Sequence, residues 1–519
     1  MIRKFIDKLL GKSPPAKDGA GKGARIPLGK RVEVAAAEHG INPELLDERA
    51  VKVVRTLQEA GHAAYIVGGA VRDLLVARRP KDFDVATDAT PEQVKALFRR
   101  AFIIGRCFRI VHVSFGRGRE HVVVDVSTFR AYLDAEQAEQ VGGNEKTSKS
   151  EMAGKSHVVD AAGRVLRDNV WGPQIEDAAR RDFTINAMYY DPLTQIVIDY
   201  HGGIKDIKKR ALRMIGDPAS RFREDPVRIV RAVRFAAKLG FDIEPATRAP
   251  IKEMAALLDN VPSSRLFDEL FKLLQTGHSL ASVAELRKQG LQQRFALLAP
   301  LMGEGVKHKN QRVQFIEAAL ADTDARIAQD KGVAPSYLLA CLLWHEVRER
   351  WQALRDGGEH AAPALHLAID AVFDARVGDI SGRGKLGTDM REIWLMQPRF
   401  DRRSGTTPYS LIEQPRFRAA YDFLRLRADT GEVDDELADW WEDFSLGSGE
   451  EREALIAAAR EAQRTRPLPR EARDPRDVRE AGEPDDLAPA SDSESGSAPA
   501  KKRRRRRRKP ASARTGDAA

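Results

Sequence analysis

Apolar and polar residues early in the chain predict two short strands around a glycine turn. The apolar run 63–67 is typical of a buried strand, and the glycines Gly68 and Gly69 are typical of a tight turn. Residues 71–78 favour a helix that begins at this turn. A second strand is expected at 82–87, where apolar and polar positions alternate.

The same patterning continues to about residue 130 and indicates a mixed α/β unit with a small sheet. A helix is expected at 42–60, where Asn42 and Pro43 form a start signal, and it would brace the first strand. Another is expected at 90–100, with Thr90 as its cap. Three further segments alternate β-branched or aromatic residues and predict strands: 102–104, 110–115 and 121–128.

Beyond this unit the chain becomes helical. Residues 133–167 are polar and predict a long inserted loop. After it, apolar residues recur near helical spacing, with Gly or Pro between segments. We expect helices at 226–239, 264–275, 311–327, 335–350, 361–375, 415–429 and 450–463.

The excess positive charge of the chain lies near its C-terminus. With 519 residues, 42% of them hydrophobic, it is expected to form two or more folded units. The formal charge is +9, and residues 501–509 alone are nine consecutive basic residues, so the remainder is balanced. We expect 464–519 to be a disordered, arginine-rich tail that binds polyanions such as RNA.

Cysteine content and hydropathy indicate a cytoplasmic protein. Cys107 and Cys341, far apart in sequence, predict no disulfide framework and no thiolate metal site. The longest apolar candidate, 337–344, is too short to span a membrane and predicts a core helix. Residues 2–10 form a basic amphipathic segment without a cleavage site, for which a peripheral membrane contact and a frayed surface helix both stay open.

The pair Asp82 and Asp84 carries the first candidate chemistry. The two carboxylates share one face of the expected strand, while Phe83 and Val85 point into the core. Their repulsion is relieved by a cation, and Mg²⁺ prefers a few carboxylates together with substrate phosphates. Alone, the pair is equally typical of an edge strand; beside the glycine turn, it predicts metal-dependent nucleotidyl transfer.

Two further acids have open interpretations. Asp125 is the only acid in an apolar strand, so either an arginine pairs with it or it helps to hold metal opposite the acid pair. Asp182 lies in the cluster 180–186, which precedes an apolar, aromatic segment where we expect a strand or loop to enter a helix. There Arg180 and Arg181 could grip phosphates, and Asp182 could bind a ribose hydroxyl or complete the acidic cluster.

A third cluster surrounds the start of the helix at 226. Asp225 is expected to cap this helix, with Pro226 at its first position. Arg228, Arg231 and Arg234 follow at three-residue spacing and form a basic stripe, opposite core positions at 229, 233 and 236. Such a stripe is either a solvated face or part of a donor and acceptor set that reads a base edge.

The order of these motifs resembles the class II template-independent nucleotidyltransferases, which comprise tRNA CCA-adding enzymes and bacterial poly(A) polymerases. The resemblance spans about 45–275 and implies an α+β fold, with a nucleotidyltransferase α/β head followed by all-α neck, body and tail. The motifs that carry it are Gly68-Gly69-x-Val71-Arg72-Asp73, Asp82-x-Asp84, Arg180-Arg181-Asp182-Phe183-Thr184-Ile185-Asn186 and Arg223-Glu224-Asp225-Pro226-x-Arg228.

The resemblance also implies roles for single residues. Asp82 and Asp84 would be the catalytic carboxylates that hold two Mg²⁺ ions, and either Asp125 or Asp182 would be the third acid of the site. Asp225 with Arg228 would read the incoming base. The residues implied to bind the nucleotide are Gly68, Gly69, Arg72, Asp73, Arg181, Asp182, Asn186, Asp225, Arg228 and Arg231.

Basic segments favour the poly(A) branch. The stretch 105–113 resembles one that follows the catalytic strand in bacterial poly(A) polymerases, although Cys107 stands where a basic residue is expected. The stretch 415–424 resembles their C-terminal region, and with residues 399–403 it interleaves basic and aromatic residues as RNA-contacting surfaces do. Core aromatics beside surface arginines would give the same pattern. The residues expected to contact RNA are Arg106, Arg109, Arg416, Arg418, Lys501, Arg503 and Arg508.

The sequence therefore predicts an enzyme that adds AMP from ATP to RNA 3′ ends, with release of pyrophosphate. A CCA-adding enzyme and a catalytically silent RNA-binding protein remain the alternatives. We expect a monomer, with proteins of RNA degradation or RNA chaperoning as candidate partners. The expected parts are a mobile arm at 1–40, a catalytic head at 41–200, a helical neck at 201–280, a helical body at 281–463 and the tail at 464–519.

Overall fold

The computed structural model describes residues 28–105, 108–116, 121–132, 139–140, 157–159, 165–168, 170–302, 310–376 and 384–465. Several expectations lie outside these residues. They concern the amphipathic segment 2–10 and most of the arm, most of the tail, Cys107, and the RNA candidates Arg106, Lys501, Arg503 and Arg508.

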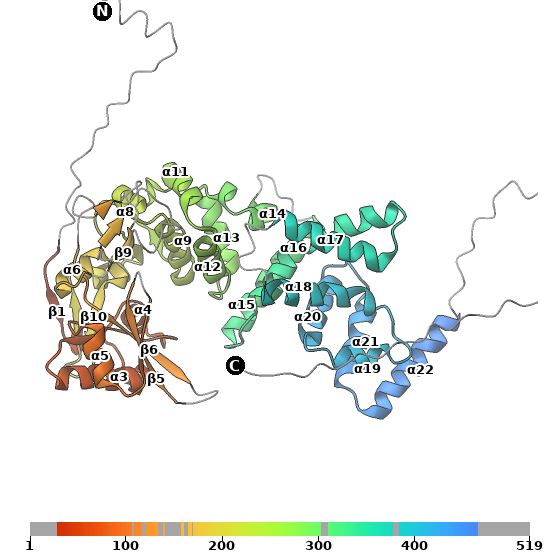
Figure 1. The fold of residues 1–519 in the computed structure, drawn as a ribbon, viewed down its shortest axis with the longest axis horizontal. Coiled ribbons are helices and arrows are strands. Elements are labelled where there is room, and N and C mark those ends of the chain that lie inside the picture. Colours follow the sequence, from red (N-terminus) through yellow and green to blue (C-terminus); the bar gives the residue numbers. More distant parts are fainter. Residues whose placement is uncertain are drawn as a thin grey trace, which may run out of the picture. The chain divides into compact units, whose positions relative to one another are not determined.

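A mixed sheet forms the N-terminal part, in the order β1-β11-β10-β2-β3-β6-β5-β4 (Figure 1). Its only parallel pair joins β3 to β6, and the other neighbours run antiparallel. The strands are β1 (Val32–Val34), β2 (Ala64–Val67), β3 (Asp84–Thr87), β4 (Ala101–Ile104), β5 (Ile110–Phe115), β6 (Val122–Thr128), β10 (Met188–Asp191) and β11 (Ile196–Asp199). The expected α+β fold is confirmed, and the sheet is larger than the sequence pattern indicated.

Strand β10 corrects one expectation. The aromatic segment after Asn186 was expected to enter a helix, and it forms a strand between β2 and β11 instead. Tyr189 and Tyr190 are both fully buried although they point to opposite faces of the sheet. A strand covered on both faces shows no alternation of apolar and polar residues, which is why its period was misread.

Helices pack against this sheet. Helix α3 (Glu48–Glu59) packs against β2, as predicted, but Asp47 caps it, while Asn42 caps a short 3-10 turn before it. Helix α5 (Pro91–Leu97) begins at the predicted cap Thr90, which forms a capping box with Gln93. The other helices up to residue 208 are α2 (Ala36–His39), α4 (Gly69–Leu75), α6 (Gln174–Arg180) and α7 (Gly203–Lys208).

The inserted segment is partly regular, so the prediction of a plain loop at 133–167 is wrong. Three short strands lie there and form a separate sheet: β7 (Glu139–Gln140), β8 (His157–Val159) and β9 (Val165–Asp168). They are too short for a hydrophobic pattern to reveal.

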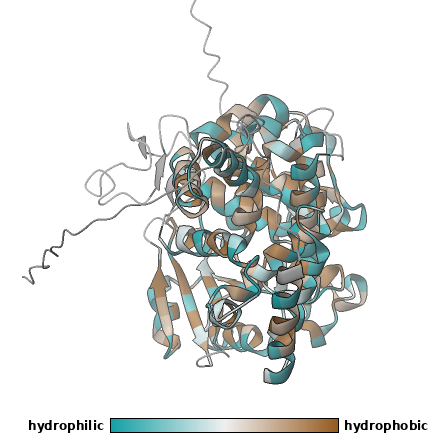
Figure 2. Ribbon diagram, turned by 90° about the vertical axis from the view of Figure 1, so that its right-hand side faces the viewer, coloured by the Kyte–Doolittle hydropathy of each residue, from teal (hydrophilic) through white to brown (hydrophobic). Residues whose placement is uncertain are grey.

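The rest of the described chain is helical apart from the short parallel pair β12 (Ala211–Leu212) and β13 (Asp242–Ile243). Hydrophobic and hydrophilic stretches alternate along the helical ribbons (Figure 2), and the buried apolar residues of the helices belong to the core clusters. The helices are α8 (Pro218–Glu224), α9 (Val227–Leu239), α10 (Pro245–Arg248), α11 (Ile251–Met254), α12 (Ser263–Leu274), α13 (Ser279–Lys288), α14 (Ala299–Met302), α15 (Gln311–Ala328), α16 (Pro335–Asp356), α17 (Ala361–Ala375), α18 (Lys385–Met396), α19 (Thr407–Ile412), α20 (Phe417–Asp429), α21 (Asp435–Leu446) and α22 (Gly449–Thr465).

Helix α16 contains the apolar run 337–344, and these residues are buried in the core as predicted. In the described part of the chain, no helix is long and apolar enough to cross a membrane. The main core cluster runs from residues of the sheet into the helices up to residue 426. The expected domain boundaries stay predictions.

Candidate active site

The glycine turn lies beside the acid pair. Val67 at the end of β2 pairs with Asp84 at the start of β3, so the turn that follows Val67 begins next to this carboxylate. Gly68 has φ 74° and ψ −126°, a conformation that residues with a side chain rarely adopt. A Cβ on Gly68 would lie 3.5 Å from Arg181 Nη1, which places the guanidinium against the turn.

The predicted alternation of the acid strand is confirmed. Phe83 and Val85 are buried, while Asp82 and Asp84 are exposed. Although Asp84 keeps exposed surface, the protein groups around its carboxylate displace water from it. This desolvation first, and then the nearby carboxylates Asp125 and Asp82, raise the pKa of Asp84 to about 6 against the opposing effect of Arg181. A bound cation would stabilise the charged form of this carboxylate.

Asp125 has a partner that was not considered from the sequence. It pairs in register with Asp84 on the parallel strand β3, and His112 Nε2 on β5 lies 3.1 Å from its Oδ1. Burial raises the pKa of Asp125, and His112 acts in the opposite direction. Across the described residues, no group of three or more His, Cys, Asp or Glu side chains is arranged to hold a metal ion.

A buried network holds Arg181 beside the glycine turn. Its Nη2 donates to Asp177 Oδ2 at 2.9 Å, and Tyr189 Oη donates to the same oxygen at 2.8 Å. Although burial opposes the charge, the guanidinium groups of Arg181 and Arg180 hold the pKa of Asp177 at about 2. The sequence pointed to Arg181 but missed Asp177, whose position four residues before it on one helix is the signal of such a pair.

Asp182 is also occupied by protein groups. Arg231 donates to Asp182 Oδ2 through Nε at 2.8 Å and Nη2 at 2.6 Å. The other oxygen, Oδ1, accepts from the backbone N–H of Phe183 and from Asn186 Nδ2. Arg72, which is buried, donates through Nη1 to Asn186 Oδ1 at 2.7 Å. These hydrogen bonds link the motif after the glycine turn, the motif around Asp182 and the arginine stripe.

The arginine stripe is not a solvated face. Ile229, Val233 and Ala236 are buried as predicted, but each arginine opposite them forms an ion pair. Arg228 Nη1 lies 3.0 Å from Glu224 Oε2, and the stripe continues to Arg234, whose Nη2 lies 3.3 Å from Glu269 Oε2.

The side chains of the predicted base-reading residues Asp225 and Arg228 bind other partners and not each other. Asp225 Oδ2 accepts from Arg265 Nη2 of α12 at 2.7 Å, whereas Arg228 is bound by Glu224 and by the carbonyl oxygen of Arg221. Asp225 also accepts from the backbone N–H of Val227 at 3.3 Å, and Pro226 occupies the cap position.

A hollow of about 440 Å³ collects most of these side chains. Seven of the residues around it are cationic and three are acidic, so it suits a polyanion. The sequence-predicted residues Asp82, Asp73 and Asp125 do not line it. Phe235 and Lys238 line it without having been expected, although Lys238 lies four residues after Arg234 and continues the stripe. The lining residues are Gly68, Gly69, Arg72, Asp84, Arg180, Arg181, Asp182, Asn186, Asp225, Arg228, Arg231, Arg234, Phe235 and Lys238.

The described RNA candidates have acidic partners. Arg109 pairs with Glu92, and Arg416 Nη2 lies 2.8 Å from Asp389 Oδ1. Arg418, with 74% of its side chain exposed, lies 3.0 Å from Asp422. The aromatic residues between these arginines are buried in the core, including Phe400 and Phe417, so the pattern of core aromatics beside surface arginines is the one present.

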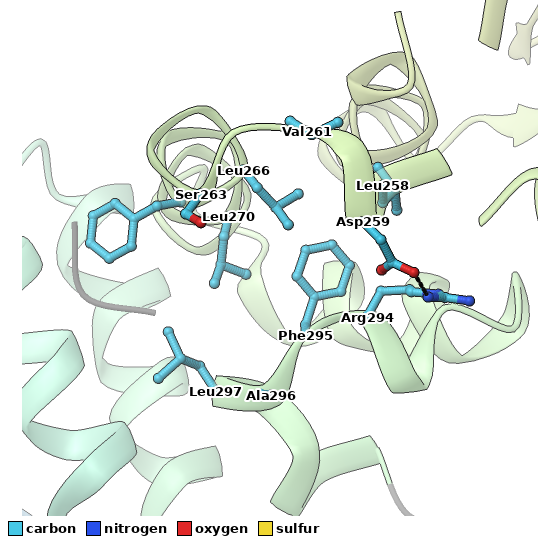
Figure 3. A pocket seen from close by; sticks show the side chains of 11 residues that line it. Leu258, Asp259, Val261, Ser263, Leu266, Leu270, Arg294, Phe295, Ala296 and Leu297 are labelled. Atoms are coloured by element: carbon cyan, nitrogen blue, oxygen red, sulfur yellow. Dashed lines mark hydrogen bonds and ion pairs between the residues drawn. The ribbon is translucent and has the colours of Figure 1, made fainter. Parts of the chain in front are cut away.

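A second, smaller hollow of about 170 Å³ lies between the start of α12 and the segment before α14 (Figure 3). Leucine, valine and phenylalanine side chains surround it, and an ion pair of 2.5 Å between Arg294 Nη1 and Asp259 Oδ2 stands at one side. The cation there is already neutralised by its neighbour. The excess of positive charge needed to hold a triphosphate is present at the 440 Å³ hollow beside the glycine turn.

Comparison with known proteins gives the following matches. Three family models match: "Poly A polymerase head domain" over residues 64–213, "Probable RNA and SrmB- binding site of polymerase A" over 240–300, and "Polymerase A arginine-rich C-terminus" over 357–510. Poly(A) polymerase I of Haemophilus influenzae is 40% identical over 441 residues, which cover 84% of this chain and 92% of that protein.

Of two further relatives, one is a poly(A) polymerase and the other, a CCA-adding enzyme, matches a smaller share of this chain. Poly(A) polymerase I of Escherichia coli O6:H1 is 40% identical over 81% of this chain and 87% of its own length. The CCA-adding enzyme of Bacillus licheniformis is 35% identical over 46% of this chain and 53% of its own length. The similarity to the two poly(A) polymerases covers most of the chain and extends through its helical part.

Proposed function

Because this chain belongs to the family of bacterial poly(A) polymerases, we propose that it transfers AMP from ATP to the 3′ end of RNA with release of pyrophosphate, and that the hollow beside the glycine turn is where it does so. The observation that carries this assignment is the carboxylate of Asp84, which opens at the glycine turn onto a hollow rich in arginine.

Mg²⁺ fits the acid pair. Desolvation first, and then the nearby carboxylates Asp125 and Asp82, raise the pKa of Asp84, and oxygen donors that repel each other are suited to a hard cation. Asp82 and Asp84 would hold Mg²⁺, an ion that completes its shell with substrate phosphates and water. When bound, two such ions would acidify the RNA 3′-hydroxyl and neutralise the leaving pyrophosphate.

The arginines of the hollow bind and orient the triphosphate. Arg181 is fixed against the turn by Asp177 and Tyr189, so its position is set before ATP arrives. Backbone N–H groups of the turn can approach a phosphate closely because Gly68 and Gly69 carry no side chains. Preorganised donors of this kind supply most of the catalytic contribution expected from protein groups in phosphoryl-type transfer.

Selection of adenine is assigned to Asp225 and Arg228, following the family pattern. Arg228 is already held by Glu224 and by the carbonyl oxygen of Arg221, so its remaining N–H groups have a fixed direction. A fixed donor set favours one base edge over others, since a wrong base leaves polar groups unpaired. Arg416, Arg418 and Arg109 are the described candidates for the RNA path.

One experiment distinguishes the poly(A) polymerase function from the CCA-adding and silent RNA-binding alternatives. The protein is incubated with a generic RNA and each nucleoside triphosphate in turn, and the products and pyrophosphate are measured. Long A tracts are expected with ATP. Use of CTP confined to tRNA ends would instead support the CCA-adding alternative, and binding of RNA without release of pyrophosphate would support the silent RNA-binding protein.

A further inference from the structure

A further cationic hollow lies at the β1 edge of the eight-stranded sheet, away from the site just described. It measures about 490 Å³ and is formed by β1, the end of β11 and helix α7. In the sheet, β11 and β10 stand between β1 and β2, so β1 is three strand spacings, about 14 Å, from the strand that leads to Gly68. The residues around it are Lys30, Val32, Val34, Asp199, Tyr200, Gly202, Ile204, Lys205, Lys208 and Lys209.

The lysines of this hollow are unpaired. Lys30, Lys205, Lys208 and Lys209 are all exposed, and within the described residues none of their ammonium groups forms an ion pair or a hydrogen bond. The one carboxylate beside them, Asp199, is buried and accepts from the backbone N–H groups of His201, Gly202 and Ile204 at the start of α7. In the active site, by contrast, the arginines of the stripe have acidic partners. The charge of this further hollow is therefore available to a ligand.

Its floor is apolar. Val34 and Ile204 pack against the main core, while Val32 is 50% exposed, high for a valine in a strand. β1 is also the last strand of the sheet on this side, so its outer edge has no neighbouring strand in the described part of the chain. An apolar floor, a lysine rim and an open strand edge together suit an extended segment that presents apolar groups on one side and acidic groups on the other.

The residues around the hollow argue against two other occupants. Single-stranded RNA binds through stacking on exposed aromatic rings, and the one ring here, Tyr200, is buried and donates its hydroxyl to Gln174. The chain's own residues 1–27 contain seven basic and two acidic residues, so they carry the same charge as the rim.

We propose that the hollow between β1 and α7 is a docking site for an acidic, amphipathic segment of a partner protein. The segment would lie along β1, with its apolar side chains on Val32 and Val34 and its carboxylates toward Lys205, Lys208 and Lys209. The site is separate from nucleotide transfer, since none of these residues lines the active-site hollow.

The test uses the full chain and a fluorescein-labelled peptide of about ten residues that alternates glutamate with valine, the period of an extended strand. Fluorescence anisotropy compares the wild type with the triple variant Lys205→Glu, Lys208→Glu and Lys209→Glu. The matched control reverses three exposed cations on α3 and on or just after α5, Lys52, Lys95 and Arg99. Circular dichroism and thermal unfolding verify that both variants fold.

We expect the α7 variant to weaken peptide binding about tenfold or more, because three attractions become repulsions, while the control variant changes it less than about twofold. Binding of a labelled oligo(A) and AMP incorporation should stay at wild-type levels in both. Peptide binding that is absent, or equally weakened in the control, would overturn the proposal. A loss of oligo(A) binding in the α7 variant would overturn it in favour of an RNA path.

Discussion

Asp84 on β3 and Asp125 on β6 occupy paired positions of the only parallel pair in the head sheet, and His112 stands opposite Asp125 on its other side. Burial is the main cause that raises the pKa of Asp125; the imidazole of His112 acts in the opposite direction, and the carboxylate of Asp82 adds to the rise. This position gives the two acids different roles: Asp84 opens onto the arginine-rich hollow, whereas Asp125 is engaged by His112.

Replacing the two acids should separate these roles. Asp84→Asn is expected to lower AMP transfer by about a thousandfold or more, since the acid pair then loses a ligand at the reacting phosphate. Asp125→Asn should lower it about tenfold at most. Steady-state rates with ATP and a generic RNA measure both, and circular dichroism verifies folding. An Asp125→Asn variant as inactive as Asp84→Asn would make Asp125 the missing third ligand.

The glycines of the turn give a second prediction with an internal control. Gly68→Ala should cost about 1–3 kcal/mol and lower kcat/KM for ATP, because φ 74° and ψ −126° are strained for alanine. Gly69→Ala should be tolerated by the fold, since its φ is ordinary and a Cβ there would meet only the end of the Arg72 side chain, at 3.5 Å. Urea unfolding and ATP kinetics compare them, and equal losses in both variants would contradict the strain argument.

A third prediction concerns the ion pair that fixes Arg181. Asp177→Asn should reduce the free energy of unfolding by about 3 kcal/mol at pH 7, because it leaves the partly buried guanidinium of Arg181 without its partner. The pKa of Asp177 is about 2 in the folded protein, below its ordinary 3.8, so this stabilisation is present above pH 4 and is lost as the pH falls toward 2.

The difference between wild type and Asp177→Asn should therefore shrink as the pH is lowered from 7 to 3.5. Urea unfolding at each pH measures it. Tyr189→Phe keeps the charge pair, removes the hydrogen bond to Asp177 and a longer one from Arg181, and should cost only about 1–2 kcal/mol. A difference that does not depend on pH would show that Asp177 is not the group that titrates.

A fourth prediction separates base selection from folding within the arginine stripe. Arg228→Ala should change the preference for ATP over CTP while leaving stability nearly intact, because Glu224 keeps a second cationic partner in Arg221. Arg231→Ala should destabilise the protein by about 3–5 kcal/mol, because it leaves the carboxylate of Asp182 buried without a cation. Single-nucleotide incorporation and urea unfolding measure the two effects. An unchanged ratio of ATP to CTP use in Arg228→Ala would remove this residue from base selection.

The sequence predicted the parts of this fold that have a clear period. The acid strand was placed correctly because Phe83 and Val85 alternate with the two aspartates, and α9 because Ile229, Val233 and Ala236 recur at helical spacing. β10 was missed because both of its faces are buried.

The candidate site was harder to predict, since a motif names residues but not their partners. Asp182 and Arg231 lie 49 positions apart, and nothing in either segment indicates that Arg231 donates twice to one carboxylate oxygen of Asp182. His112 opposite Asp125 is a consequence of register between two strands, which a pattern of single positions does not specify. Aromatic residues near 400 and 417 suggested an RNA surface, and their burial depends on helices that pack from elsewhere in the chain.

The last prediction concerns His345 in α16, a buried histidine with neither ring nitrogen hydrogen-bonded in the described structure. Burial is the main cause that lowers its pKa to about 4; the guanidinium groups of Arg348, Arg312 and Arg427 act in the same direction, and Glu432 opposes them. The unfolded chain therefore takes up a proton near pH 6.5, which the folded protein accepts only near pH 4. Folding loses stability as the pH falls between these values.

His345→Phe removes the titrating group and keeps an aromatic ring beside Phe315. Its Tm should therefore fall less than that of the wild type between pH 7 and pH 4.5, since all other groups titrate alike in both proteins. Thermal unfolding at half-unit pH steps measures the two curves. Parallel curves would mean that His345 takes up its proton equally in the folded and unfolded chain, and so that a polar group reaches its ring when the protein is in solution.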